Sequence, residues 1–254
     1  MLDNSQIPIR KISGFYIGSL EPDFDLIQDD LANLFEKKPE VARNILDGIQ
    51  GQNSQALEGR GAILLASLPK YGPLVIKSYH RGGLFHHLVQ DRYFRFGKTR
   101  GQLEYEMLKQ VAELGVNAPK AVAFAYTGSF FYKCWLVMCE IIGKKSLVQL
   151  SNENPELCLE MIPLLISQLA ILIKNKILHI DLHPGNVVLD REGKLFLLDF
   201  DNARIVAWSR NSVRNYYLRR WRRAVIKHNL PDFLSEAVCQ GLRKSFEEDD
   251  DDKN

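Results

Sequence analysis

The sequence predicts an α+β fold of two lobes, with strands dominating the first lobe and helices the second. Short apolar runs separated by turn residues occupy residues 59–142, and longer apolar stretches follow Gly143. The 254 residues can bury a substantial core, and 46% apolar with 25% charged residues excludes a disordered or fibrous chain. We expect residues 1–139 to form the first lobe and residues 140–246 the second.

The first lobe is expected to contain a hairpin, one amphipathic helix and a second pair of strands. Gly59-Arg60-Gly61 and P-K-Y-G-P are turn signals on either side of an apolar run, which favours the hairpin. Apolar residues every three or four positions before Gly115 favour the helix. The expected elements are a helix within Leu26–Ile49, strands at Ala62–Leu68 and Leu74–Ile76, a helix at Leu103–Leu114, and strands at Val122–Tyr126 and Trp135–Ile142.

The second lobe is expected to be mainly helical. Its elements are a buried helix at Cys158–Lys176, short apolar strands at Ile177–Leu189 and Leu195–Phe200, and a basic helix at Trp208–His228. The acidic run at residues 247–254 is expected to be a disordered tail because it lacks apolar residues to bury.

Charge and composition exclude several classes of function. A net charge of +2 does not indicate a dedicated nucleic-acid binder. The four cysteines form no C-x-x-C pair, which favours a reducing compartment. The N-terminus lacks the apolar segment of a secretion signal, and the apolar stretch Ile162–Ile173 is interrupted and shorter than the ~20 residues that span a bilayer.

The residues that point to chemistry lie in H-I-D-L-H-P-G-N-V-V-L-D, His179–Asp190, and in L-F-L-L-D-F-D, Leu195–Asp201. Asp181, Asn186 and Asp199 carry the oxygen ligands that a hard cation such as Mg²⁺ prefers. Capped turns at strand ends are the alternative interpretation, which would require three independent spacings to coincide.

The pattern H-x-D-L-x-P-x-N followed by apolar-apolar-D-F resembles the catalytic and metal loops of kinase-like phosphotransferases. The resemblance implies a protein-kinase-like fold that uses ATP and Mg²⁺. Asp181 would then accept or orient the proton of the acceptor hydroxyl, and Asn186 and Asp199 would hold Mg²⁺. Lys77, in V-I-K, would grip the α- and β-phosphates while Glu104 orients it.

Other parts of the kinase pattern occur in the expected order. Gly59 and Gly61 resemble the glycine-rich turn, although they give only G-x-G and an ordinary hairpin turn is the alternative. Glu140, at the end of an apolar strand, is similar to the hinge at which an adenine ring binds. Lys77 alone could be a surface lysine on a strand. Glu106 lies two residues from Glu104 and on a helix would point elsewhere.

Three segments resemble the lipopolysaccharide kinase family, and most closely the Kdo (3-deoxy-D-manno-octulosonic acid) kinases within it. They are Y-H-R-G-G-L at Tyr79–Leu84, the D-R-Y-F-R-F segment after it, and T-R followed by E-Y-E-M-L at Thr99–Leu108. The resemblance implies phosphorylation of the 4-hydroxyl of Kdo on a lipid A precursor. Asp201 in place of the D-F-G glycine, and the absence of A-P-E, favour a small-molecule or glycolipid kinase over a protein kinase.

The basic aromatic helix at Trp208–His228 suggests where such an acceptor would bind. Arginines near a membrane surface each contribute ~1 kcal/mol to binding of anionic headgroups. A solvated helix face is the alternative. The acceptor residues expected on this view are Arg81, Arg100, Arg220 and Arg223. The location implied is the cytoplasmic side of the inner membrane, as a peripheral protein with no nucleic-acid partner and no inferred protein partner.

Three other functions remain open from the sequence. A heptose kinase of the lipopolysaccharide core would share the family pattern. A small-molecule kinase of the aminoglycoside or choline type would lack the R-G-G segment and the basic aromatic helix. A pseudokinase would normally have lost Lys77, Asp181 or Asp199, all of which this chain retains.

Overall fold

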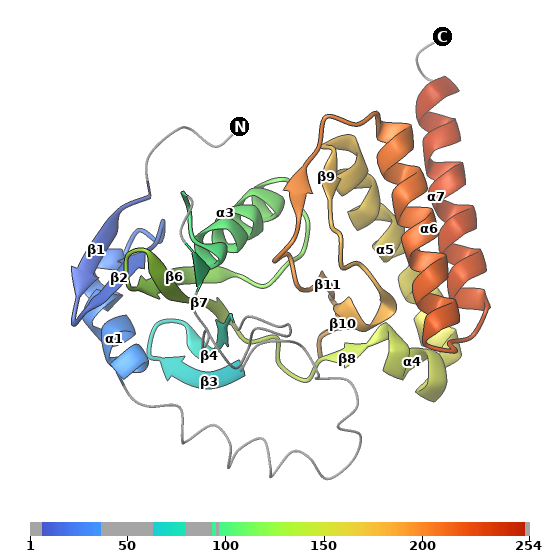
Figure 1. Cartoon of the computed structure of the whole chain (residues 1–254). Helices are drawn as coiled ribbons and strands as arrows, with labels where there is room; N and C mark the ends of the chain where they lie inside the picture. The colour runs from blue at the N-terminus through green and yellow to red at the C-terminus, as the bar shows by residue number, and fades with distance from the viewer. Residues whose placement is uncertain (1–6, 37–62, 80–92, 95–96, 252–254) are drawn as a thin grey trace. The chain divides into compact units, whose positions relative to one another are not determined.

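The structure, a computed structural model of the chain, describes residues 7–36, 63–79, 93–94 and 97–251. The chain divides into two compact units, one built on a β-sheet and one mainly helical (Figure 1). The first unit runs to Lys109 and resumes at Lys120–Glu140, whereas the second contains Gln110–Pro119 and the chain from Ile141 onward. The sheet-based unit and the helical unit confirm the predicted α+β fold class.

A seven-stranded antiparallel sheet forms the first unit, in the order β1-β2-β6-β7-β4-β3, with β5 paired to β7. Its strands are β1 (Ile9–Ile12), β2 (Phe15–Gly18), β3 (Ile63–Leu68), β4 (Gly72–Ser78), β5 (Tyr93–Phe94), β6 (Ala121–Thr127) and β7 (Phe131–Cys139). Its helices are α1 (Phe24–Glu36) and α3 (Arg100–Glu113), the last turn of which belongs to the second unit.

Strand β6 lies inside the sheet and is buried along nearly its whole length. Ala123 and Ala125 pack in the same apolar cluster as the buried side chains of α1. Phe124, between them, contacts the ring of Tyr105 in α3 at a centroid distance of 5.4 Å. Because successive strand residues point to opposite faces, α1 and α3 cover the two faces of the sheet. A strand covered on both faces reads as a continuous apolar run, which is why its sequence predicted it.

The expected hairpin forms as β3–β4, and the expected helix and the second pair of strands form as α3, β6 and β7. The helix expected within Leu26–Ile49 is described as α1, and residues 37–49 lie outside the described residues. The sequence analysis missed β1 and β2. Each has only four residues, and β2 pairs with β6 about a hundred residues later, at positions such as Ile17 with Ala125.

The second unit contains two small antiparallel sheets and four α-helices. The sheets combine β8 (Lys145–Ser146), β10 (Val187–Leu189) and β11 (Leu195–Leu197), and β9 (Ile177–Leu178) with β12 (Arg204–Ile205). The helices are α4 (Leu147–Glu153), α5 (Pro155–Lys174), α6 (Arg210–Lys227) and α7 (Phe233–Asp251), with a 3-10 turn η2 at Pro184–Asn186.

Helix α5 is the apolar centre of this unit. Asn154 caps its first turn by accepting a hydrogen bond from the Leu157 N–H at 3.0 Å. With 20 residues and a mean hydropathy of 1.9, it is long and apolar enough to cross a membrane by length and composition alone, a test that core helices also pass. It contacts α4, α6 and α7, and residues from Cys158 to Ile173 form its buried face. We therefore assign it to the core of the second unit.

The region expected as one strand, Ile177–Leu189, is a strand only at its two ends, β9 and β10. Between them the chain forms the loop that carries Asp181 and the turn η2. Pro184 and Gly185 interrupt the strand. Proline lacks the N–H that a strand would use, and the Gly185 N–H donates to His183 Nδ1 within the turn. The prediction of a continuous strand was therefore wrong.

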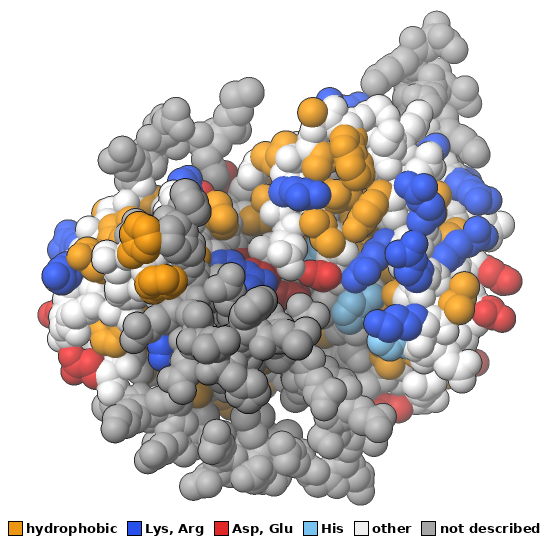
Figure 2. All heavy atoms as spheres, viewed as in Figure 1, with side chains coloured by type: hydrophobic (Ala, Val, Ile, Leu, Met, Phe, Trp, Pro, Cys, Tyr) orange, Lys and Arg blue, Asp and Glu red, His pale blue; other side chains and the backbone are white. Residues whose placement is uncertain are grey.

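Helices α6 and α7 pack together, and the Trp221 indole N–H donates to the Leu234 carbonyl at 2.9 Å. Figure 2 shows Lys and Arg side chains gathered on the visible face over this helical region. The sequence analysis missed α7 and expected a disordered tail from residue 247. The helix instead extends to Asp251. Phe246 is buried and packs the turn before the acidic residues, and glutamate is a good helix former.

The segment Gln110–Pro119 lies outside the unit in which the sequence placed it. The Asn117 N–H donates to the Gln168 side chain at 2.6 Å, and the Asn117 carbonyl accepts from the Leu197 N–H at 2.9 Å. Both partners belong to the second unit. These backbone hydrogen bonds, rather than sequence continuity with α3, determine where the segment packs.

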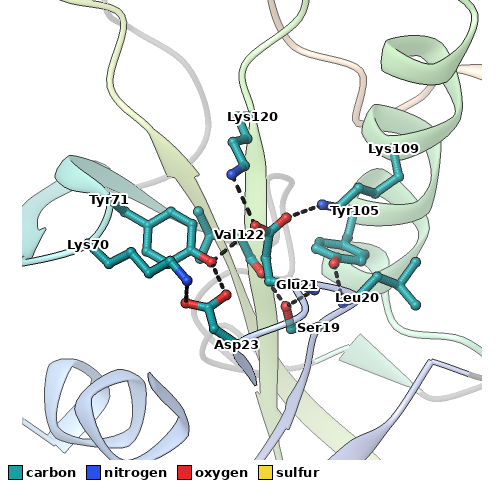
Figure 3. A network of polar contacts seen from close by, with 10 residues as sticks. All are labelled: Ser19, Leu20, Glu21, Asp23, Lys70, Tyr71, Tyr105, Lys109, Lys120 and Val122. Carbon is teal, nitrogen blue, oxygen red and sulfur yellow. Dashed lines mark hydrogen bonds and ion pairs between the residues drawn. The ribbon is translucent and has the colours of Figure 1, made fainter. Parts of the chain in front are cut away.

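A polar network anchors the N-terminal segment within the first unit (Figure 3). The Tyr71 hydroxyl lies 2.6 Å from Asp23 Oδ1 and 3.0 Å from Glu21 Oε2. Glu21 also pairs with Lys109, and with Lys120 at 3.0 Å. The network therefore connects the segment before α1 to the β3–β4 turn, to α3 and to the start of β6.

Hydrogen bonds and nearby lysines keep the buried carboxyl groups of this network ionised. The hydrogen bond from Tyr71 lowers the pKa of Asp23, and Lys70 contributes a second interaction. Burial alone would raise the pKa of Glu21, but the hydrogen bonds from Lys109 and Lys120 lower it overall. Because both folded pKa values are lowered, these carboxylates stabilise the fold at neutral pH, and this contribution is lost as the pH falls below the ordinary carboxyl pKa of about 4.

We expect Tyr71→Phe to lower the free energy of unfolding at pH 7 by about 1–3 kcal/mol, because two partly buried carboxylates lose a donor. Chemical denaturation at pH 7 measures the change. Tyr16→Phe is the matched control, since Tyr16 stacks on Tyr126 and its hydroxyl forms no hydrogen bond with another described residue. Equal losses in the two variants would contradict the role of the network.

Candidate active site

Lys77 and Glu104 form an ion pair in the first unit. Lys77 Nζ lies 3.0 and 2.9 Å from the two carboxylate oxygens of Glu104, whose side chain is 1% exposed. Lys77 lies on β4 and Glu104 on α3, so the pair joins a strand to a helix. Glu106 instead pairs with Lys98 at 2.7 Å, in agreement with the different helix face predicted for it.

Two more side chains surround this ion pair. The Tyr79 hydroxyl donates a hydrogen bond to Glu104 Oε2. The Tyr79 ring lies 5.3 Å from Lys77 Nζ and 5.5 Å from the Arg100 guanidinium. Arg100, expected to bind the acceptor, therefore also contacts Tyr79 within the first unit. The sequence analysis used Tyr79 only as a family marker, and the structure shows that it holds the carboxylate that faces Lys77.

The start of α3 explains how Glu104 reaches Lys77. Buried Thr99 caps the helix, its hydroxyl accepting from the Gln102 N–H at 3.3 Å. At Gly101 the helix passes so close to β7 that a Cβ would lie 2.9 Å from the Trp135 carbonyl oxygen. Only glycine fits there without displacing backbone. The T-R-G-Q-L-E segment thus sets both the first turn of α3 and its distance from the sheet.

The other residues predicted for nucleotide binding have different outcomes. Gly59 and Gly61 lie outside the described residues, as does Arg81, which was expected to bind the acceptor. The Glu140 N–H donates to the Pro73 carbonyl at 3.0 Å, so this amide is already used by the sheet. An adenine ring at this position would have to bind another backbone group.

In the second unit, backbone hydrogen bonds order the loop between β9 and β10. The Asn186 side-chain amide donates to the Asp181 carbonyl at 2.9 Å, and the Asn186 N–H donates to the His183 carbonyl at 2.8 Å. His183 Nδ1 accepts from the Gly185 N–H at 3.0 Å. Burial, followed by the neighbouring His228, lowers the pKa of His183. His183 is therefore a hydrogen-bonded loop residue, and the Asn186–Asp181 hydrogen bond holds these two residues next to each other.

His179 connects this loop to the segment that carries Asp199. Its ring is fully buried, lies 2.8 Å from the Leu198 carbonyl through Nε2, and packs on Phe200 with a centroid distance of 4.6 Å. Since a carbonyl only accepts, Nε2 carries the proton. Burial lowers the pKa of His179, which favours the neutral ring. The His179 N–H also donates to the Tyr217 hydroxyl at 2.8 Å, so α6 supports the same loop.

Asp199 lies between Leu198 and Phe200 and has an uncommon backbone conformation. Its φ of +62° falls in the left-handed region, which aspartate adopts more readily than most residues. The Leu198 N–H donates to the Asn186 carbonyl at 2.8 Å, and Phe200 is fully buried. Backbone strain of this kind persists where neighbours hold it and is frequent at functional sites. These hydrogen bonds link the segment that carries Asp199 to the loop that carries Asp181 and Asn186, all within the second unit.

Both carboxylate oxygens of Asp181 have partners. Asn202 Nδ2 donates to Oδ2 at 2.9 Å, and the Arg220 guanidinium lies 3.4 Å from Oδ1. The sequence analysis missed Asn202, although it directly follows D-F-D. Arg220, expected to bind the acceptor, contacts Asp181 in the structure. Arg223, also expected to bind the acceptor, is exposed on α6.

We expect Gly101→Ala to lower the stability of the first unit, against the usual effect of this change in a helix. Helix propensity alone favours alanine by ~1 kcal/mol, whereas forcing a methyl against the Trp135 carbonyl costs ~1–3 kcal/mol. Thermal denaturation followed by circular dichroism measures the balance. A raised melting temperature would mean that α3 does not depend on the close approach.

Comparison of the sequence with known proteins finds relatives and a family. A protein named 3-deoxy-D-manno-octulosonic acid kinase from Vibrio vulnificus (strain CMCP6) is 31% identical over 148 residues, 57% of this chain and 62% of the relative. Proteins of the same name from Xylella fastidiosa (strain M23) and Vibrio parahaemolyticus serotype O3:K6 are 30% identical over 175 residues and 26% over 214. These alignments cover 66% and 82% of this chain and 68% and 86% of the two relatives.

The match to the Vibrio vulnificus relative thus spans less than two thirds of that protein's length. The sequence model of one family, described as the lipopolysaccharide kinase (Kdo/WaaP) family, matches residues 47–240. That range includes Lys77, Glu104, Asp181, Asn186 and Asp199. The chain therefore belongs to the lipopolysaccharide kinase (Kdo/WaaP) family.

Proposed function

We propose that this protein is an ATP-dependent kinase that phosphorylates the 4-hydroxyl of Kdo on a lipid A precursor. The observation that carries the proposal is the Lys77–Glu104 ion pair in a member of this family. A strand lysine held by a helix carboxylate is the arrangement with which protein kinases position ATP phosphates. The relatives named as Kdo kinases supply the acceptor class.

The first unit would supply the grip on the nucleotide. Lys77 would bind the α- and β-phosphates of ATP, and Glu104 would hold the ammonium in place through both carboxylate oxygens. Tyr79, as a donor to Glu104, keeps that carboxylate oriented. Gly59 and Gly61 remain candidates for the turn over the phosphates. Of the hinge residues, Glu140 would contribute through a group other than its engaged N–H.

Asn186 and Asp199 would hold Mg²⁺ in the second unit, and the ion would neutralise charge on the phosphates. The donor set fits: one carboxylate and one amide oxygen are the partial shell that Mg²⁺ takes from a protein when water and phosphates complete it. Among the residues that the structure describes, no three His, Cys, Asp or Glu side chains gather as a full metal site. Asn186 is suited to this role because its NH₂ group is fixed on the Asp181 carbonyl, which leaves its side-chain oxygen as the ligand.

Asp181 would accept or orient the proton of the acceptor hydroxyl. Asn202 and Arg220 hold its two oxygens, which restricts the rotation of the carboxylate. Phosphoryl transfer depends mainly on positioning and charge neutralisation, so a fixed base is a sufficient contribution. Arg220 and Arg223, together with Arg81 and Arg100 of the first unit, are the proposed contacts to the acidic acceptor.

The acceptor also implies a location. A lipid A precursor resides in a membrane, so we place the enzyme on the cytoplasmic side of the inner membrane as a peripheral protein. The basic face of α6 supports this placement by charge, since cationic residues bind anionic headgroups.

The direct test is transfer of labelled phosphate from ATP to a Kdo–lipid A precursor by the purified protein in the presence of Mg²⁺. We expect label on the Kdo residue, with the 4-hydroxyl identified by NMR of the product. Label only on a heptosylated acceptor would indicate a heptose kinase. Label on aminoglycosides or choline alone would indicate a small-molecule kinase, and nucleotide binding without transfer would indicate a pseudokinase.

Asp181→Ala is expected to reduce kcat by ~10²-fold or more, because the acceptor proton loses its base. Nucleotide binding, followed by thermal shift with ATP and Mg²⁺, should remain. Glu192→Ala is the matched control: it removes an exposed carboxylate from the turn after β10 and should retain full turnover. Unchanged turnover in the Asp181 variant would exclude it as the base.

Asn202→Ala tests the positioning of Asp181. We expect kcat to fall about tenfold, which corresponds to ~1.4 kcal/mol, with the KM for ATP unchanged. Asn202→Asp should fall further, since a like charge would replace the donor. A rise in the KM for ATP with unchanged kcat would show that Asn202 serves nucleotide binding instead.

A further inference from the structure

Helix α6 carries its arginines on two different sides. Arg220 and Arg222 are two residues apart and therefore ~200° apart around the helix. Arg220 contacts Asp181. Arg219 and Arg222 instead line a hollow in the second unit together with Arg243 of α7. The proposed function gives a role to Arg220 and Arg223, whereas it gives none to Arg219 and Arg222.

The hollow is large and has a mixed lining. Its volume is about 630 Å³, and its walls are Trp208, Ser212, Asn215, Leu218, Arg219, Arg222 and Arg243. Most of the α6 members recur at steps of three or four residues, which places them along one face of the helix. We call this hollow the α6–α7 groove.

The α6–α7 groove concentrates positive charge. Arg219, Arg222 and Arg243 are all exposed, and among the side chains that the structure describes none of them forms a recorded ion pair with an acid. Three neighbouring cations repel each other unless an anion joins them. Figure 2 shows this basic character on the helical region. The planar guanidinium suits phosphate especially well, since it can donate two parallel hydrogen bonds.

The lining of the groove also includes apolar surface. Trp208 lines the groove and is 42% exposed. Large exposed apolar side chains next to clustered arginines are typical of proteins that lie at a membrane surface, where tryptophan sits at headgroup level. A free phosphate ion would leave most of 630 Å³ and the indole unoccupied.

We propose that the α6–α7 groove binds the phosphate-bearing headgroup of an anionic lipid at a membrane surface. Arg219, Arg222 and Arg243 bind the phosphate, and Trp208 inserts beside it at the level of the headgroups. This inference deepens the proposed function, because it identifies a surface that would hold the enzyme near a lipid acceptor. The binding does not require phosphoryl transfer, so it can fail or succeed independently of the kinase assignment.

The test uses the full chain and sedimentation with phosphatidylcholine vesicles containing phosphatidic acid, without nucleotide. Arg219→Gln with Arg222→Gln removes two groove charges. Lys227→Gln with Lys244→Gln is the matched control, since it removes two exposed charges from α6 and α7 outside the groove lining. We expect the groove variant to bind about 30-fold more weakly, from ~1 kcal/mol per cation, and the control to change only slightly.

Each outcome decides the proposal. Loss confined to the groove variant supports it, provided that circular dichroism shows both variants folded. Equal losses in both would mean that general charge attracts the protein, and no loss in either would mean that the groove is not used; both results overturn it. Full displacement from vesicles by millimolar inorganic phosphate would identify a soluble phosphate ligand and would also overturn it.

Trp208 supplies a second measurement that does not depend on removing charge. Its fluorescence should shift to shorter wavelength when vesicles containing phosphatidic acid are added, because the indole leaves water. Trp208→Phe should abolish the shift while Trp135 and the buried Trp221 remain. A shift that persists in this variant would place the contact elsewhere on the surface.

Discussion

The hydrogen bond between the buried imidazole of His179 and the Leu198 carbonyl is the constraint on which the two segments with the proposed catalytic and metal-binding residues depend. It joins two stretches separated by nineteen residues of sequence and leaves Asp199 between a bonded Leu198 and a buried Phe200. The first histidine of H-I-D is therefore a structural residue. Because carbonyls only accept, the bond requires the ring to keep its proton on Nε2.

The first unit has a comparable constraint, which comes from the small size of one residue, Gly101, rather than from a hydrogen bond. Glu104 reaches Lys77 because α3 lies unusually close to β7, and this distance depends on the missing side chain of Gly101. Thr99 fixes where the helix begins, so Glu104 faces the strand lysine and Glu106 does not. In both units, residues that touch no substrate in the proposed mechanism determine where the reactive groups lie.

The sequence predicted those features that depend on the spacing of residues within one element or turn. The strand lysine and the helix carboxylate, which form an ion pair in the structure, and the loop residues Asp181 and Asn186 could be named as candidates because each has a fixed position within one element or turn. The residues missed were those defined by non-local contacts. Asn202 could be assigned a role only once Asp181 was placed beside it, and β2 could be recognised only through its pairing with β6.

Loop geometry was also beyond prediction. The apolar residues of Ile177–Leu189 favoured a continuous strand, and the structure divides it because Asn186 and His183 bond within the loop. The boundary at residue 140 was close to the division between units, but the bonds of Asn117 assign the end of α3 differently. Strand ends and unit boundaries depend on which group forms a hydrogen bond with each backbone N–H or carbonyl. Sequence patterns do not show these partners.

The anchoring of the N-terminal segment has a consequence for how the family match is used. The match covers residues 47–240, yet β1, β2 and α1 precede it and complete the same sheet and core. A protein trimmed to the matched range would leave Tyr71 without its carboxylate partners and would cut α7 before the buried Leu242 and Phe246. The segment that contains all of these contacts is therefore longer than the segment that matches the family model.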